Sequence, residues 1–345
     1  MNKGFWEQLA EPFFVLAPLA NVTDAAFRKL ISSLGKPDVM FTEFVSADGL
    51  FLGGEHARNL LMQDLIYSRE EKPIVAQFFT SKPDLMEKAA RLALDMGFDG
   101  VDINMGCPDR NIEKQGACAA LIKNPTLAKE IIAAAKTGAE SADRQIPVSI
   151  KTRIGYNEDE LDTWLPVLLS AKPSTVTLHA RTRREMSKVP AHWDAISRAV
   201  KIRDKMNSKT LIVGNGDVMS IGEAKQKIDE TGADGIMLGK AIFGNPWLFA
   251  NETCAEHNCR IERPTKLLAK AGCSCVTVEK KLETMLKHTR LFVELLPQKN
   301  FAIMKKHYKT YVNDFPGAHE LRGELMQKNT LEEVEKVTEN FLKTL

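Results

Sequence analysis

The sequence predicts an α/β fold, a TIM (β/α)8 barrel followed by a small C-terminal all-α helical domain. Short apolar segments rich in β-branched residues alternate with helical segments over roughly the first 250 residues. Eight such units in about 250 residues are typical of a TIM barrel. The strand pattern stops near residue 251 and only helical periodicity follows. We therefore expect a barrel over residues 1–250, a cysteine-containing linker over 251–278 and a helical domain over 279–345.

The eight predicted strands are short and almost wholly apolar, as strands buried on both faces of a parallel sheet are. Two helices between them are well marked. One opens at residue 23 with Thr23 or Asp24 as its cap, and one covers residues 83–96 and stops at Gly97. The strands are expected at residues 13–17, 39–44, 74–79, from 101 onward, 148–153, 175–179, 211–217 and 235–240.

Composition excludes several classes of protein. The chain has 345 residues, of which 44% are hydrophobic and 27% charged, which is ordinary for a soluble globular protein. It has neither an apolar run of about 20 residues nor a basic N-terminal segment followed by an apolar one. Six cysteines in a chain of this length do not indicate a disulfide framework, and a net charge of +2 does not by itself indicate a polyanionic partner. We expect a cytoplasmic monomer without a membrane partner.

The segment Asn104-Met105-Gly106-Cys107-Pro108 ends the fourth strand abruptly. Gly106 permits a sharp turn or close approach of a ligand, and Pro108 restricts Cys107 to an extended conformation. The thiol is thereby placed at the carboxyl end of a strand, where the chemistry of barrel enzymes takes place. The alternative is that Cys107 is a small buried hydrophobic residue, the commoner role of a free cysteine.

Polar side chains recur at the carboxyl ends of the other strands. Those ends form one rim of a barrel, so residues far apart in the sequence converge there. Each alone has a structural explanation, as a hydrogen-bonded core amide, a core histidine or a lysine whose stem is buried. Their convergence favours a functional site. The set is Gln77, Asn104, Cys107, Lys151, Arg153, His179, Asn215 and Lys240.

The glycine-rich ends of the seventh and eighth strands, Gly214-Asn215-Gly216 and Gly239-Lys240, are typical of barrel phosphate sites. No Gly-x-Gly-x-x-Gly follows the first strand, which disfavours a Rossmann dinucleotide site. Flavin mononucleotide (FMN) satisfies both observations, with its phosphate at these two strands and its ring across the barrel mouth. Lys151 would stabilise negative charge on the reduced ring, and Gln77 would hydrogen-bond its polar edge.

The chain resembles the tRNA-dihydrouridine synthase family. The resemblance rests on residues 17–28 (APLANVTDAAFR), on Asn104-Met105-Gly106-Cys107-Pro108 and on residues 116–121 (GACAAL). It continues through Lys151-Thr152-Arg153, residues 179–182 (HART), 215–217 (NGD) and Gly239-Lys240, in order along the barrel.

The resemblance implies an oxidoreductase that uses FMN, with NADPH as donor, to reduce the C5–C6 double bond of selected uridines in tRNA. Reduced FMN would deliver hydride to C6, and Cys107 would donate a proton to C5, which suits a thiol with an ordinary pKa near 8.5. The implied cofactor residues are Pro18, Leu19, Ala20, Gln77, Lys151, His179, Asn215, Gly216, Asp217, Gly239 and Lys240. The implied substrate residues are Asn104 and Arg153 on the uracil, with Arg181, Lys305, Lys306 and His307 on the tRNA.

Three positions depart from the family pattern: Ala180 and Cys118 stand where glycine is usual, and Lys240 where arginine is usual. Lysine at a phosphate site keeps the charge but loses the bidentate fork, so FMN is expected to bind somewhat less tightly. Cys118 is interpreted as a packing residue.

Helical periodicity marks residues 282–292, 301–311 and 331–345 of the C-terminal domain. Its middle is basic, which would attract a phosphate backbone, although a charge run is also typical of a solvated helix face. The resemblance favours the first interpretation, because Lys305-Lys306-His307 lies where the family has a basic triplet for tRNA. The basic residues are Lys280, Lys281, Lys287, Arg290, Lys299, Lys305, Lys306, His307 and Lys309.

Four cysteines, Cys254, Cys259, Cys273 and Cys275, lie between the two predicted domains. They could form a structural zinc site, but Cys-x-Cys is not the usual Cys-x2-Cys spacing. We expect a reduced linker without metal.

Two other functions remain open from the sequence. One is an FMN enzyme acting on a free pyrimidine, because dihydroorotate dehydrogenases carry a similar Asn-x-x-Cys-Pro turn; the basic helical domain argues against it. The other is a non-enzymatic RNA-binding barrel, for which Cys107 and Lys151 would be dispensable. Which uridine is reduced depends on how folded RNA lies across both domains, and the sequence does not specify it.

Overall fold

A computed structural model describes residues 3–250 and 276–345. Eight parallel strands form one sheet in the order β1-β8-β7-β6-β5-β4-β3-β2. A parallel bridge between Val15 and Val39 brings the two edges together, so the sheet closes into a barrel. The predicted TIM barrel is thereby confirmed. The strands are β1 (Phe13–Leu16), β2 (Met40–Ser46), β3 (Ile74–Phe79), β4 (Gly100–Met105), β5 (Val148–Arg153), β6 (Thr175–His179), β7 (Leu211–Asn215) and β8 (Gly235–Leu238).

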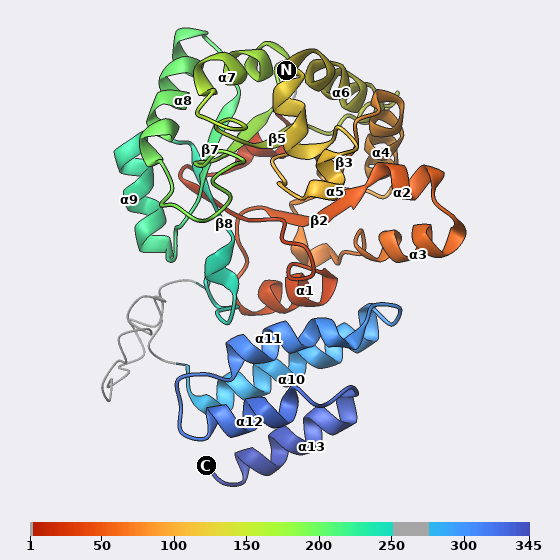
Figure 1. The fold of residues 1–345 in the computed structure, drawn as a ribbon, viewed down its shortest axis with the longest axis vertical. Coiled ribbons are helices and arrows are strands. Elements are labelled where there is room, and N and C mark those ends of the chain that lie inside the picture. The colour runs from red at the N-terminus through yellow and green to blue at the C-terminus, as the bar shows by residue number, and fades with distance from the viewer. Residues whose placement is uncertain (1–2, 251–275) are drawn as a thin grey trace.

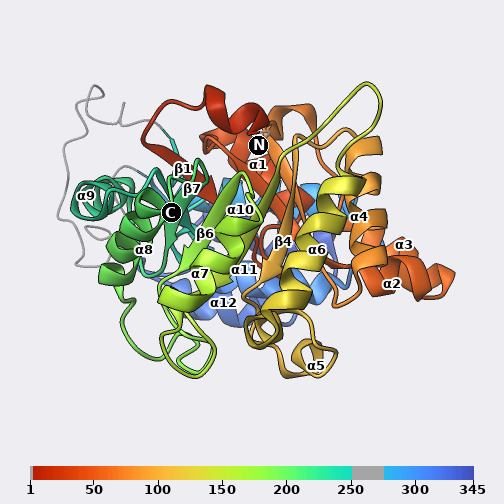
Figure 2. The same ribbon diagram turned by 90° about the horizontal axis from the view of Figure 1, so that it is seen from above.

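Helices surround the barrel on its outside (Figures 1 and 2). Each connection between successive strands contains at least one helix, and the one between β4 and β5 holds two short elements before its main helix. The helices of the barrel are α1 (Ala25–Leu34), α2 (Ala47–Leu52), α3 (Glu55–Gln63), α4 (Pro83–Asp95), α5 (Arg110–Glu113), α6 (Pro125–Gly138), α7 (Leu161–Ser170), α8 (Trp193–Lys205) and α9 (Ile221–Thr231). Short 3-10 helices are η1 (Gly4–Gln8), η2 (Arg69–Glu71), η3 (Cys118–Lys123) and η4 (Lys240–Ile242).

The interior of the barrel is apolar at one end and polar at the other. Trp6 of η1 packs on Phe13, the first residue of β1, with ring centroids 5.6 Å apart. Val75 and Val213 belong to the same interior cluster. Because side chains two positions apart on a strand share a face, Gln77 and Asn215 point to the same interior, nearer the carboxyl ends. The amino-terminal end of the barrel is therefore plugged, and its polar groups gather at the other end.

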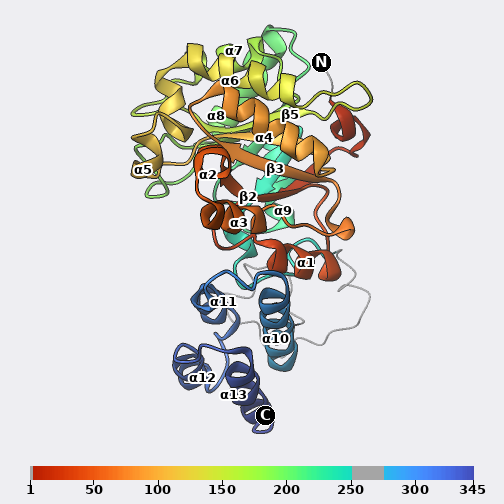
Figure 3. The same ribbon diagram turned by 90° about the vertical axis from the view of Figure 1, so that its right-hand side faces the viewer.

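The C-terminal helices form a second layer against α1 (Figures 1 and 3). Their apolar core includes Ala25 and Ala26 of α1, so the two parts of the chain share buried surface. Figure 3 shows α10 beside α1, with α12 and α13 farther from the barrel. These elements are α10 (Val278–Leu295), the 3-10 helix η7 (Phe301–Ile303), α11 (Met304–Tyr311), α12 (Ala318–Leu325) and α13 (Leu331–Leu342).

The predicted C-terminal all-α region is present, with two differences in detail. Residues 301–311 form η7 followed by α11 rather than one helix. Helix α12 has only eight residues, too few for a clear periodic pattern in the sequence. None of the described helices is both long and apolar enough to cross a membrane.

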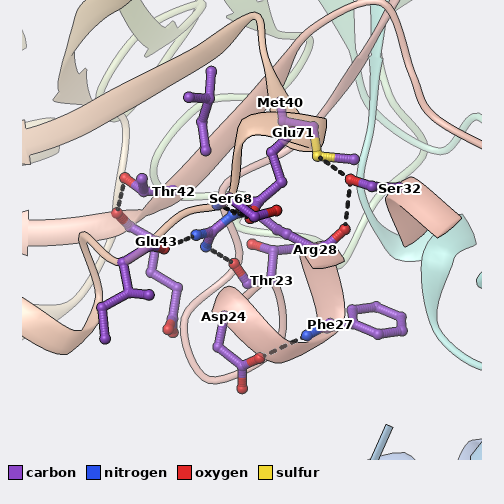
Figure 4. A network of polar contacts seen from close by, with 12 residues as sticks. Thr23, Asp24, Phe27, Arg28, Ser32, Met40, Thr42, Glu43, Ser68 and Glu71 are labelled. Carbon is purple, nitrogen blue, oxygen red and sulfur yellow. Dashed lines mark hydrogen bonds and ion pairs between the residues drawn. The ribbon is translucent and has the colours of Figure 1, made fainter. Parts of the chain in front are cut away.

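A buried ion pair fixes α1 to the chain around η2 (Figure 4). Arg28 Nε donates to Glu71 Oε2 at 2.7 Å, and both side chains are at most 1% exposed. The guanidinium also donates to the carbonyl oxygens of Thr23 and Ile66. The other Glu71 oxygen accepts from the backbone N–H of Ser68 at 2.7 Å. Both buried charges are thus fully hydrogen-bonded, which is the condition for tolerating them in a protein interior.

Replacing Glu71 with Ala should lower the free energy of unfolding by about 3–5 kcal/mol, because the Arg28 guanidinium would stay buried without its counter-charge. Urea unfolding followed by circular dichroism measures the change. The matched control is Glu283→Ala, which removes an exposed carboxylate 3.9 Å from Lys280 Nζ and should unfold like the wild type. Equal midpoints for the Glu71 and Glu283 variants would contradict the assignment.

Candidate active site

The side chains of Asn104 and Arg153 hold the turn that carries Cys107. Asn104 Oδ1 accepts hydrogen bonds from the backbone N–H groups of Gly106 and Cys107, both at 3.0 Å. Arg153 Nε donates to the carbonyl oxygen of Gly106 at 2.7 Å. Arg153 is only 7% exposed, and its Nη1 also donates to the carbonyls of Thr182 and Met186. The end of β5 and the loop after β6 therefore fix the conformation of the thiol-bearing turn.

The thiol of Cys107 is half-buried and contacts the fully buried thiol of Cys118. A hydrogen bond from Cys118 lowers the pKa of Cys107 from 9.0 to about 7, against the opposing effect of burial. The pKa of Cys118 is raised well above 9.0 by burial first and by Cys107 second. Cys118 is therefore more than the packing residue that the sequence suggests, because it donates a hydrogen bond that stabilises a thiolate at position 107.

A chain of hydrogen bonds inside the barrel leads to this turn. Ser149 Oγ donates to Asp102 Oδ1 at 2.6 Å, and Gln77 Nε2 donates to Asp102 Oδ2 at 2.7 Å. Asn104 Nδ2 then donates to Gln77 Oε1 at 3.1 Å. Burial raises the pKa of Asp102 to about 7, although the hydrogen bonds from Ser149 and Gln77 favour its ionised form. The amide of Gln77 is thus oriented by its neighbours on both sides.

Lys151 lies opposite Asn104 in the register between β4 and β5. No hydrogen bond or ion pair joins its ammonium group to another residue within 3–250 or 276–345. Burial lowers its pKa to about 8, and Arg153 lowers it further, while Asp102 and Cys107 oppose the shift. The group is therefore predominantly charged at neutral pH, and the ammonium of this half-buried side chain is a donor available to a ligand.

The ends of β6 and β7 meet through His179, Arg181 and Asp217. His179 pairs in register with both Arg153 and Asn215. Burial, reinforced by the nearby cations, holds the pKa of His179 well below 6.5, so the ring is neutral. Arg181 Nη1 lies 3.2 Å from His179 Nε2, and a guanidinium can only donate. Nε2 is therefore the acceptor, which assigns the ring proton to Nδ1.

Arg181 is 4% exposed and its other groups are also engaged. It forms an ion pair with Asp217 and donates to the carbonyl oxygen of Val189 at 2.6 Å. The hydrogen bond from Arg181 lowers the pKa of Asp217, which also accepts from the backbone N–H of Ala191 at 3.0 Å. Arg181 thus fixes the loops after β6 and β7. In this arrangement its guanidinium is buried and engaged within the protein, and its contact with tRNA stays a prediction.

Free backbone donors lie at the ends of β7 and β8. Among the described residues, the N–H groups of Gly216 and Gly239 have no hydrogen-bond acceptor. Gly216 has φ of +134°, and a Cβ there would lie 2.9 Å from the Cβ of Ala191 and 3.3 Å from the His179 ring. Only glycine therefore fits this position without a shift of its neighbours. Asn215 Nδ2 donates to the carbonyl oxygen of Met237 at 2.8 Å, which ties the two strand ends together.

These donors fit the phosphate-bearing flavin that the sequence indicates. Two free backbone N–H groups, the His179 Nδ1–H and the exposed ammonium of Lys240 are suitable phosphate donors. The unpartnered ammonium of Lys151 suits a ring that gains negative charge on reduction. Pro18, Leu19 and Ala20 directly follow β1, beside β8, and range from buried to exposed. Gln77 differs from the other predicted cofactor residues, because it is fully buried and its amide already binds Asp102 and Asn104.

The predicted tRNA triplet in α11 is not a uniform surface. Lys306 is exposed and Lys305 is half-buried, with Nζ donating to Asn329 Oδ1 at 2.9 Å. His307 is 0% exposed and lies between Phe27 and His288, with ring centroids 5.0 and 4.5 Å away. Its imidazole, carried by α11, packs against α1 and α10, and burial lowers its pKa to about 3, while its contact with tRNA stays a prediction.

The basic run is also divided by contacts that the sequence does not reveal. Lys299 is buried against the barrel, and Arg290 pairs with Glu335 of α13 at 2.7 Å.

Besides the contacts of Lys299, the sequence did not lead us to Asp102 or to the role of Cys118. Asp102 lies inside the segment that the sequence singled out, and a carboxylate in an apolar strand was a signal for it.

The four linker cysteines, Cys254, Cys259, Cys273 and Cys275, lie outside the described residues. Within the described residues, no group of three or more His, Cys, Asp or Glu side chains is arranged to hold a metal ion.

Comparison with known proteins identifies similar chains. The family profile described as dihydrouridine synthase (Dus) matches residues 15–345. A probable tRNA-dihydrouridine synthase of Staphylococcus aureus (strain MRSA252) is 35% identical over 344 residues, covering 99% of this chain and 96% of that protein. Probable tRNA-dihydrouridine synthase 2 of Bacillus subtilis (strain 168) is also 35% identical, with 99% and 97% coverage.

Among solved structures, histamine dehydrogenase from Rhizobium sp. 4-9 is similar with a TM-score of 0.50 and 12% identity. The match covers 81% of this chain but only 48% of the dehydrogenase chain. At this identity the similarity concerns the fold alone.

Replacing Cys118 with Ala should raise the pKa of Cys107 from about 7 toward its ordinary 9.0, because the hydrogen bond that stabilises the thiolate is lost. The pH dependence of Cys107 alkylation by iodoacetamide, followed by mass spectrometry of its peptide, measures the shift. Cys118→Ser retains a donor and should stay closer to the wild type. An unchanged alkylation profile in Cys118→Ala would show that Cys118 does not act on the Cys107 thiol.

Proposed function

The chain belongs to the dihydrouridine synthase family, and from this premise we propose that it reduces selected uridines of tRNA to 5,6-dihydrouridine. As a member it is an oxidoreductase. The observation that best supports the specific reaction is the Cys107 thiol, held at the carboxyl end of β4 by Asn104 and Arg153 and surrounded by buried cations. A thiol fixed in this way is suited to proton transfer at one defined position of a bound base.

The proposal includes FMN as cofactor and NADPH as donor. The bound flavin would supply hydride to C6 of the uracil. The N–H groups of Gly216 and Gly239, His179 Nδ1–H and Lys240 would hold its phosphate, with Asn215 and Asp217 shaping the loop around it. Lys151 and Gln77 would lie against the ring, and Pro18, Leu19 and Ala20 would border it.

Cys107 is the residue proposed to complete the reduction by donating the proton of its thiol to C5 of the uracil. The pKa of about 7 means that the thiol form, which is the donor, is populated at and below neutral pH and declines as the pH rises. Arg153 contributes to lowering this pKa, so the cation next to the thiolate also stabilises the product of proton transfer. The thiolate then regains a proton from solvent before the next turnover.

Asn104 and Arg153 have a positioning role and retain capacity for the substrate. Each uses part of its hydrogen-bonding groups on the turn around Cys107. Asn104 Nδ2 has one further N–H beyond its bond to Gln77, and Arg153 Nη2 has no acceptor among the described residues. These donors would bind the carbonyl oxygens of a uracil that has been flipped out of the RNA.

The barrel and the C-terminal helices would bind different parts of the substrate complex. Residues 1–250 would hold flavin and uracil, and residues 279–345 would bind the phosphate backbone of tRNA through Lys305, Lys306 and neighbouring exposed cations. Backbone contacts set the register of an RNA on a protein, so this surface would decide which uridine reaches Cys107.

Anaerobic visible spectroscopy tests the reaction, with Cys107→Ala as the informative variant. The wild type should show flavin absorbance that bleaches with NADPH and returns with unmodified tRNA. Cys107→Ala should bleach in the same way but fail to recover with tRNA, because the proton donor is gone while the cofactor residues remain.

Other outcomes of this experiment would favour different functions. A colourless protein that binds tRNA would indicate a non-enzymatic RNA-binding barrel, and reoxidation only by a free pyrimidine would indicate a small-molecule dehydrogenase. Loss of flavin from Cys107→Ala would assign the thiol a structural role.

Replacing Lys305 and Lys306 together with Ala should weaken tRNA binding and reduce the salt dependence of its affinity by about one to two units of slope, since up to two phosphate contacts are lost. Fluorescence anisotropy at several salt concentrations measures both. The control removes the exposed Lys88 and Lys129 of α4 and α6, which changes the net charge equally. Identical losses in the two double variants would place the RNA elsewhere.

A further inference from the structure

One lysine of the C-terminal region is buried against the barrel. Lys299 follows α10 and is 7% exposed. Its Nζ lies 2.6 Å from Glu43 Oε2 on β2 and 2.5 Å from Asp64 Oδ1, which directly follows α3. The side chains of Glu43 and Asp64 are 5% and 18% exposed. A buried ammonium with two carboxylate partners is a strong contact between the two parts of the chain.

An irregularity in β2 aims Glu43 at this lysine. Phe41 pairs with Val75 and Phe44 with Gln77, so three steps along β2 match two along β3. The strand therefore contains a β-bulge, a feature that redirects side chains near functional sites. Thr42 stabilises the bulge, because its hydroxyl accepts from the backbone N–H of Gln77 at 3.1 Å and donates to the carbonyl of Glu43 at 2.7 Å. Figure 4 shows the hydrogen bond between Thr42 and Glu43.

Glu43 also holds the loop between β1 and α1. Its Oε1 accepts a hydrogen bond from the backbone N–H of Asn21. Asn21 adopts φ of +54°, a left-handed conformation that needs local support. It directly follows Pro18, Leu19 and Ala20. One carboxylate thus joins the C-terminal helices, through Lys299, to the loop that follows β1.

The electrostatic balance of this cluster depends on Lys299. Asp24, Glu43 and Asp64 gather around it, and burial followed by Glu43 raises the pKa of both Asp24 and Asp64 to about 6. Lys299 opposes both shifts, and Arg28 opposes the shift of Asp24 to a smaller extent. Tyr311 of α11 also faces Asp24. Without the ammonium, the carboxylates would repel one another or take up protons.

We propose that Lys299 is a positioning residue, which through Glu43 and Asn21 couples docking of the C-terminal helices to the shape of the loop over residues 17–24. The proposal rests on the proposed function in one respect, that this loop borders the flavin. Its consequence is that the flavin end of the barrel is complete only when the helical region is docked. A helical region displaced by a wrongly bound RNA would then loosen the loop, which makes Lys299 a link between RNA placement and cofactor binding.

The experiment compares Lys299→Met with Lys287→Met. Lys287 is the matched control because its Nζ also crosses to the barrel side, donating to Ser33 Oγ at 2.9 Å, but within the described part of the chain it pairs with neither a carboxylate nor the loop. Lys299→Met should weaken binding of FMN to the apoprotein by about tenfold or more and speed hydrogen exchange over residues 17–24. Lys287→Met should change neither by more than about twofold.

Two further measurements separate coupling from a general loss of stability. The double variant Glu43→Gln/Lys299→Met removes both charges and should fold, with FMN affinity between those of Lys299→Met and the wild type. The deficit of Lys299→Met should also shrink from pH 8 to pH 6, because protonation of Asp24 and Asp64 relieves the repulsion that the lost ammonium had balanced.

The outcomes distinguish the two proposals. Wild-type FMN affinity and loop exchange in Lys299→Met would overturn the coupling, as would equal losses in Lys287→Met. If the wild-type protein fails to bind FMN, the proposed function fails, and the exchange rates over residues 17–24 still decide whether Lys299 holds the loop.

Discussion

A polar side chain inside a closed barrel must find its partners on neighbouring strands, and the site of this protein follows from that requirement. Asp102, Gln77 and Asn104 occupy adjacent interior positions of β3 and β4, where no solvent competes for their hydrogen bonds. Each therefore orients the next, and the last of them, Asn104, binds the backbone of the Cys107 turn. The buried carboxylate of Asp102 thus has a direct structural connection to the Cys107 thiol at the rim.

Burial inside the barrel also explains the shifted pKa values of the site. Burial lowers the pKa of Lys151, Arg153 and His179, and neighbouring cations lower each of these pKa values further. Lys151 and Arg153 nevertheless remain charged at neutral pH, while His179 becomes a neutral donor. The site thereby combines Lys151 and Arg153, both charged at neutral pH, with a neutral imidazole and the Cys107 thiol, whose pKa is lowered to about 7. Such a set suits chemistry in which negative charge develops on both a cofactor and a base.

The barrel and the strand ends were predictable because they depend on local pattern. Apolar segments of regular spacing located all eight strands, and topology alone placed Lys151, His179 and Asn215 on one rim. Which residues of the C-terminal region are buried was not predictable in this way. His307 and Lys299 look like surface residues in a basic stretch, yet one is buried on Phe27 and the other on Glu43. The β-bulge that receives Lys299 has no signature in the sequence, because it is defined only by pairing with β3.

The apolar core of the C-terminal helices includes Ala25 and Ala26, two residues of a barrel helix. The predicted division of the chain into a barrel and a helical domain therefore cuts through a shared apolar core. A chain cut after residue 250 would leave one face of α1 bare, and isolated helices would lack part of their own interior. A larger residue at either alanine of the first turn of α1 would have to be accommodated by the C-terminal helices as well as by the barrel.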